Sequence, residues 1–148
     1  MVATVSIETE RRGRAVLEIR RADDSKFHEL IRLGGEIIAS SQVEWFSGGG
    51  DAAVSAEWMP ILTQDGKGDA YIFIGHIRKG VAARAVYADG SKESVPLELP
   101  RRRVGGGIVG FFLYETTDAR REKRLLRFEA VDAAGRVVGE TQLPRGVG

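Results

Sequence analysis

Two turn sequences in the second half of the chain restrict the fold more than any other feature. The tetrapeptide Ala-Asp-Gly-Ser at 88–91 and the pentapeptide Asp-Ala-Ala-Gly-Arg at 132–136 each lie between runs of apolar and β-branched residues. Asp-Gly tolerates the positive φ of a tight hairpin turn, and the later Gly suits the left-handed position of a longer loop. The chain is therefore predicted to be mainly β, with antiparallel neighbouring strands.

Strand-like patterns recur along the chain and predict a series of short strands. Residues 3–7 and 15–20 alternate apolar and polar side chains, which predicts a first hairpin. Further strands are expected at 36–46, 54–62, 71–77, 81–87, 92–99, 108–114, 125–131 and 137–143. The run 71–77 is apolar on both sides, so it is expected to be a central strand that is covered on both faces.

One short segment has helical spacing. Phe27, Leu30 and Ile31, with Gly34 behind them, predict about two helical turns, and a strand through Phe27 and Ile31 is the alternative. The predicted core includes residues from the later strands, namely Phe73, Phe112, Leu126 and Phe128, with Val95, Leu97 and Leu99 on an inward face.

The strand pattern predicts the fold class. Short strands joined by polar turns, without a crossover helix, favour an all-β, two-sheet antiparallel β-sandwich, immunoglobulin-like or jelly-roll-like, with at most one short helix. No repeat, low-complexity tract or linker divides the 148 residues. We therefore expect one domain, 1–148, which is large enough to bury a hydrophobic core without disulfide bonds or a structural metal ion.

Composition excludes some chemistries. The chain has no cysteine, so disulfides, thiol nucleophiles and thiolate metal sites are excluded. No window of about 18 apolar residues exists, so membrane insertion is not expected. The absence of cysteine does not indicate a cellular compartment, because a cysteine-free domain can fold inside or outside the cell.

Several motifs resemble functional sites, but their contexts favour structural roles. Residues 105–110 match Gly-x-Gly-x-x-Gly but lead into strand material instead of a helix, so no cofactor is predicted. His28 and His76 lack metal-ligand spacing, and His76 is expected at a strand end. The acids Asp51, Asp65 and Asp69 lie in Gly-rich segments that favour plain turns. No catalytic residue or metal ligand is predicted.

The charge is unevenly distributed. Residues 1–74 carry 8 Lys/Arg against 12 Asp/Glu, whereas residues 75–148 carry 14 against 9. The basic residues gather in two clusters, each before a predicted strand, and these are the candidate partner or ligand contacts: Arg101, Arg102, Arg103, Arg120, Arg121 and Arg124. Solvated loops are the favoured interpretation, and nucleic-acid binding is disfavoured because aromatics do not interleave with the arginines. Trp45 is expected in the core, and Trp58 is a candidate ligand contact.

The segments 86–90, 110–114 and 128–139 resemble the late strands of bacterial immunoglobulin-like β-sandwich modules. The chain lacks the bridging cysteines of immunoglobulin domains. The resemblance implies a module of a class that binds, spaces or decorates far more often than it catalyses.

These observations favour one class of function over two others. We expect a non-catalytic structural or protein-interaction module that acts by self-association or by binding a protein partner. The alternative is a carbohydrate- or polyanion-binding module that uses Trp58 and the arginine clusters. An enzyme comes third, since it would rest only on two histidines and scattered carboxylates.

Overall fold

The computed structural model describes residues 2–9, 12–22, 26–43, 53–62, 68–101, 107–117 and 124–142. Eleven strands and no helix occur in these ranges. The strands are β1 (Ala3–Glu8), β2 (Arg14–Arg21), β3 (Phe27–Leu33), β4 (Glu36–Val43), β5 (Val54–Leu62), β6 (Gly68–Ile77), β7 (Ala82–Tyr87), β8 (Lys92–Val95), β9 (Gly110–Thr117), β10 (Leu125–Val131) and β11 (Val137–Gln142). None of these segments forms an apolar helix that would cross a lipid bilayer.

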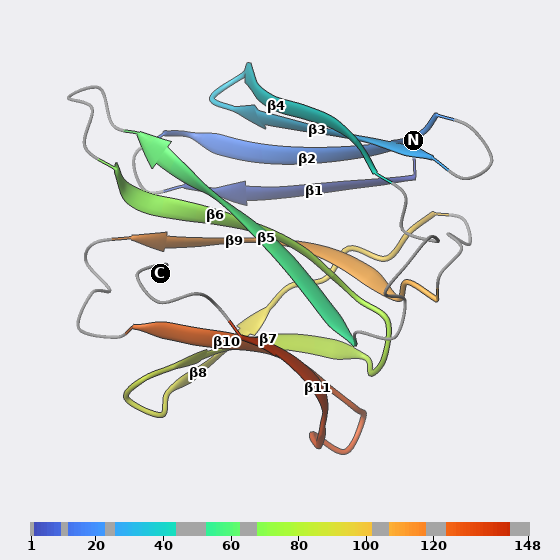
Figure 1. Cartoon of the computed structure of the whole chain (residues 1–148), viewed down its shortest axis with the longest axis vertical. Helices are drawn as coiled ribbons and strands as arrows, with labels where there is room; N and C mark the ends of the chain where they lie inside the picture. The colour runs from blue at the N-terminus through green and yellow to red at the C-terminus, as the bar shows by residue number, and fades with distance from the viewer. Residues whose placement is uncertain are drawn as a thin grey trace.

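The strands form three antiparallel sheets. A first sheet has the order β1-β2-β3-β4, a central sheet has the order β5-β6-β9, and a third sheet has the order β11-β10-β7-β8. In Figure 1 the central sheet lies between the other two. The prediction of an all-β, antiparallel, sandwich-like fold is confirmed, with three layers where the sequence indicated two.

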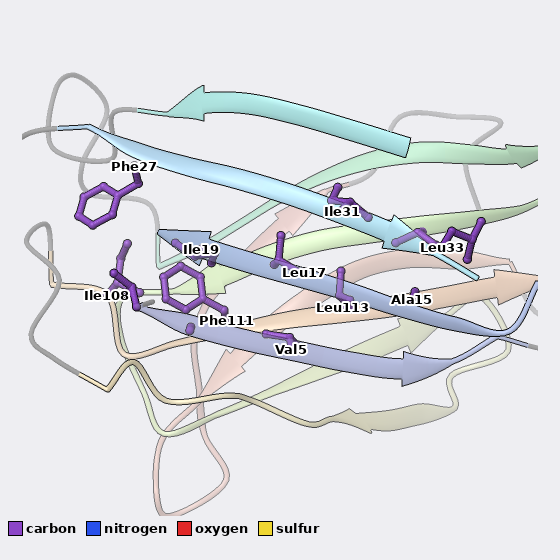
Figure 2. Close-up of a cluster of buried hydrophobic side chains, with 13 residues drawn as sticks. Val5, Ala15, Leu17, Ile19, Phe27, Ile31, Leu33, Ile108, Phe111 and Leu113 are labelled. Carbon is purple, nitrogen blue, oxygen red and sulfur yellow. The ribbon is translucent and has the colours of Figure 1, made fainter. Parts of the chain in front are cut away.

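Alternating side chains of the central sheet build two separate cores. Ile72 and Leu113 pack with the buried residues of the first sheet, whereas Phe73 and Phe112 pack with those of the third sheet. Figure 2 shows the first of these cores, in which side chains of β1, β2 and β3 meet those of β9. A sheet covered on both faces needs apolar residues at every position, which explains the continuous apolar run in β6.

The predicted hairpins form as expected. β7 pairs with β8, and β10 pairs with β11. Gly90 and Gly135 have φ values of 85° and 81°, which favour glycine in these turns. Asp132 Oδ1 accepts hydrogen bonds from the backbone N–H groups of Ala134 and Arg136, both at 2.9 Å.

The helix predicted around residue 30 is wrong. Phe27–Leu33 is strand β3, which pairs with β2 on one side and with β4 on the other. Its alternate residues Phe27, Ile31 and Leu33 are buried in the first core. Gly34 does not cap a helix. It has a φ of 58° in the tight turn to β4, so tertiary pairing outweighs a short helical pattern.

The predicted core is correct for three aromatic residues and wrong for two leucines. Phe73, Phe112 and Phe128 are fully buried. Leu126 is only half-buried, because the register shifts between Leu125 and Arg127 and places Leu125 in the core instead. Leu99 is 62% exposed; β8 ends at Val95, so the inward alternation does not continue to this residue.

A carboxylate network crosses the outer face of the third sheet. Glu129 is nearly inaccessible, and it accepts hydrogen bonds from Arg84 Nε at 2.8 Å and Arg127 Nε at 3.0 Å. Burial opposes ionisation of Glu129, but the hydrogen bonds from Arg84 and Arg127 prevail and hold its pKa below the ordinary value. The network ties β7 to β10.

Candidate functional site

The segment that follows β8 pairs with β9 at one point only, a bridge between Glu98 and Phe111. The Glu98 N–H donates to the Phe111 carbonyl at 2.8 Å, and the Phe111 N–H donates to the Glu98 carbonyl at 2.9 Å. Before Glu98, however, the chain belongs to the third sheet, where β8 pairs with β7. The segment therefore passes from one sheet to another just before this bridge.

Pro96 explains why the pairing stops. If the antiparallel ladder continued from the bridge, Pro96 would lie opposite Leu113. Proline has no N–H, so it cannot donate to the Leu113 carbonyl. Apart from the bridge, β9 has only β6 as a ladder partner in the described part of the chain, and it is the last strand of the central sheet.

The backbone of β9 directs polar groups toward this opening. In an antiparallel ladder, successive residues direct their N–H and C=O groups to alternate sides. Phe111 directs both groups away from β6, toward Glu98. By the same alternation, the peptide groups of Leu113 and Glu115 face away from β6.

A groove of about 180 Å³ lies at this edge, and we call it the β9 groove. Its described lining comes from β1, from β8 and the residue after it, and from β9: Ile7, Glu8, Glu93, Ser94, Pro96, Leu113, Tyr114 and Glu115. Sites for drug-sized ligands or cofactors usually exceed about 300 Å³. The β9 groove therefore suits the side chains of one extended segment better than a cofactor.

A chain of hydroxyl groups holds one carboxylate at the groove. Tyr114 OH donates to Glu93 Oε2 at 2.9 Å, and the Tyr87 hydroxyl forms a hydrogen bond with that of Tyr114. Because Tyr114 donates its proton to Glu93, Tyr87 is the donor to Tyr114. Burial, together with the bonds to Tyr87 and Glu93, raises the pKa of Tyr114 well above its ordinary value. Its hydroxyl therefore stays protonated and orients Glu93.

The lining of the β9 groove is acidic. Among the described residues, the lining contains the three carboxylates of Glu8, Glu93 and Glu115 and no Lys, Arg or His. Arg14 Nε lies 2.8 Å from Glu8 Oε1, but these side chains are 66% and 67% exposed. An ion pair this exposed contributes little, since water and salt screen it. The groove therefore favours a cationic ligand.

Two of the arginines predicted as contacts, Arg101 and Arg124, lie in the described part of the chain, and they belong to separate segments. Arg101 is exposed, and its N–H donates to the Val2 carbonyl beside the start of β1. Arg124 is also exposed, and its carbonyl accepts from Ala88 at the β7–β8 turn. The segment of Arg101 follows the bridge to the start of β9, whereas β10, which follows Arg124, begins near the other end of β9 (Figure 1).

Other predicted residues lie outside the described part of the chain: Trp45, Asp51, Asp65, Arg102, Arg103, Arg120 and Arg121. The same holds for the side chains of Trp58 and Asp69 and for residues 105–106. The backbone of Trp58 pairs with Phe73 in the central sheet.

Neither histidine takes part in the groove. His28 Nε2 lies 2.6 Å from Ser40 Oγ. His76 is buried, with its ring 6.3 Å from that of Phe111. Burial, aided by the charge of Arg78, lowers the pKa of His76 to about 4, so this ring is neutral at pH 7. The described residues contain no cluster of three His, Asp or Glu that could hold a metal ion.

Sequence reasoning missed the β9 groove. Its carboxylates come from three strands that are distant in the chain, and only Pro96, inside the segment expected as a strand at 92–99, signalled an interrupted ladder. No protein-family model matches the chain, and neither a curated protein nor a solved structure is significantly similar to it.

Proposed function

We propose that this protein is a non-catalytic protein-interaction module that binds an extended segment of a partner polypeptide. The segment adds to β9 as a further strand of the central sheet. The observation that carries this proposal is the edge of β9 at Leu113, which has no ladder partner among the described residues on the side away from β6 and where the β9 groove begins.

Strand addition fits the chemistry of this edge. Backbone N–H and C=O groups at a sheet edge are a template for another chain, and main-chain hydrogen bonds provide much of the affinity in this mode of binding. β9 is covered on both faces, by the first core at Leu113 and by the second core at Tyr114. An edge held this firmly loses little freedom when a ligand binds.

The carbohydrate- or polyanion-binding alternative receives no comparable support. Arg101 and Arg124, the two described arginines of its clusters, belong to different segments. The acidic lining of the β9 groove would repel a polyanion at this site. We therefore prefer a protein partner.

Backbone methylation of a bound peptide tests the proposal. We expect a library of random linear peptides, displayed on phage, to yield ligands for the full chain. N-methylation of every second peptide amide should weaken binding by about tenfold or more, because a buried acceptor that loses its donor costs about 1–3 kcal/mol. Methylation of the intervening amides should be tolerated. Binding would be measured by calorimetry.

Two results would contradict strand addition. One is a selection that yields no linear peptide ligand. The other is a methylation scan without a period of two, since only an added strand presents alternate amides to its neighbour.

A further inference from the structure

The two sides of the β9 groove differ, and an added strand would meet both. Leu113 belongs to the core beside the first sheet, whereas Tyr114 belongs to the core beside the third sheet. In an antiparallel pair, residues directly opposite each other place their side chains on the same face. The side chain opposite Leu113 would thus face β1, and the one opposite Tyr114 would face β8.

The position opposite Leu113 calls for an apolar side chain. Leu113 is buried, and Ile7 of β1 is a partly buried neighbour of the same core. Both line the β9 groove. An apolar side chain there would extend the first core and exclude water from the new ladder.

The next two positions call for cationic side chains. The side chain opposite Tyr114 would face Glu93, whose carboxylate Tyr114 OH holds at 2.9 Å. The side chain opposite Glu115 would lie on the face of β1, where Glu8 also lines the groove. Opposite charges on cross-strand neighbours stabilise pairing, and like charges oppose it.

We infer that the segment bound by the β9 groove contains, from its N-terminus, two basic residues followed by an apolar residue. Lys or Arg lies opposite Glu115 and Tyr114, and an aliphatic residue lies opposite Leu113. The order follows from antiparallel addition, the direction of the existing bridge between Glu98 and Phe111. This inference rests on the proposed function. It adds the charge and order of the ligand to the mode of binding.

Defined peptides test the order of charges. Three extended peptides would share one aliphatic residue and one neutral Thr-rich frame, and would differ only in the two preceding residues: Lys-Arg, Gln-Gln or Glu-Glu. We expect the Lys-Arg peptide to bind the full chain about tenfold more tightly than the Gln-Gln peptide at low salt, and the advantage to shrink as salt screens the charges. The Glu-Glu peptide should bind most weakly.

A charge reversal on the protein locates the effect. Glu93→Lys should reduce binding of the Lys-Arg peptide by about tenfold and improve binding of the Glu-Glu peptide. Glu36→Lys is the matched control, because it changes the net charge equally at an exposed residue of β4, the strand of the first sheet farthest from β1. This control should leave both affinities unchanged.

The outcomes separate the two proposals. Equal binding of the Lys-Arg and Gln-Gln peptides would overturn the inferred charge pattern and leave strand addition standing. Equal effects of Glu93→Lys and Glu36→Lys would also overturn it, because the preference would then come from net charge alone. If none of the three peptides binds and the library also yields no ligand, the proposed function fails.

Discussion

Phe112→Ala is expected to lower the free energy of unfolding by about 3–5 kcal/mol, the range for deletion of a buried aromatic ring. Phe112 is fully buried in the second core, and its ring centroid lies 5.1 Å from that of Phe128. The ring covers the backbone of Gly75 on the neighbouring strand, in the space that a Cβ atom at 75 would occupy. Its removal would leave a cavity between the central and third sheets.

Chemical denaturation of the variant would measure this loss. Leu126→Ala is the matched control, because Leu126 is only half-buried and should lose less on truncation. Gly75→Ala should also destabilise the fold, since its methyl group would overlap the Phe112 ring. In the double variant the new methyl would occupy the vacated space, so the two losses should not add. A Phe112→Ala variant that melts within about a degree of the parent would contradict this packing.

Glu29→Gln is expected to stabilise the protein above pH 7. Glu29 lies on β3 between the core residues Phe27 and Ile31, at a position that faces the central sheet. Burial, together with the charge of Glu57 on β5, raises the pKa of Glu29 from 4.5 to about 7. Between these values the folded state binds more protons than the unfolded state. The contribution of the Glu29 carboxyl group to the free energy of unfolding is therefore fully present below pH 4.5. It is lost as pH rises through 7, by up to about 3 kcal/mol.

His76 has the opposite dependence on pH. Its pKa falls from 6.5 to about 4, so the unfolded state binds more protons between these values, and stability is lost as pH falls. In the parent protein the two effects offset each other over the shared range. In Glu29→Gln, the remaining effect of His76 should lower stability as pH falls. In His76→Gln, the remaining effect of Glu29 should lower stability as pH rises. Denaturant titrations from acid to alkaline pH would measure both slopes.

Two controls accompany this prediction. Glu57→Gln should stabilise the protein above pH 7 by less than Glu29→Gln does, because burial is the larger cause of the raised pKa of Glu29. Near pH 4 the parent and Glu29→Gln should have similar stability, since the carboxyl group is then protonated in the parent as well. A Glu29→Gln variant that is less stable than the parent at pH 8 would contradict the account of this buried carboxyl group.

The hairpins were predictable because their turn chemistry is local. The Asp-Gly turn at 89–90 and the apolar run in β6 depend on neighbouring residues alone, and both appear as expected. The division into three sheets was not predictable, since strand order depends on contacts between distant segments. Phe27 and Ile31 show the limit of a short pattern: their spacing of four residues fits one face of a helix and also one face of a strand.

The candidate site was less predictable than the fold. Glu93 and Tyr114 lie 21 residues apart, and only the folded chain brings them together. Pro96 is the one local signal of the open edge, because its missing N–H interrupts a ladder. The density of arginines in the sequence made the two clusters candidate contacts. Their described members, Arg101 and Arg124, lie in separate segments.

Amide hydrogen exchange at Leu113 tests the central claim most directly. In the full chain, the N–H groups of Phe112 and Tyr114 face β6 and should already exchange slowly, whereas that of Leu113 faces the β9 groove. Addition of the Lys-Arg peptide should slow exchange at Leu113 and leave Tyr114 unchanged, because a new strand would bond only the outward amides. A bound peptide that leaves Leu113 exchange unaltered, or protects the edge of β4 instead, would contradict strand addition at β9.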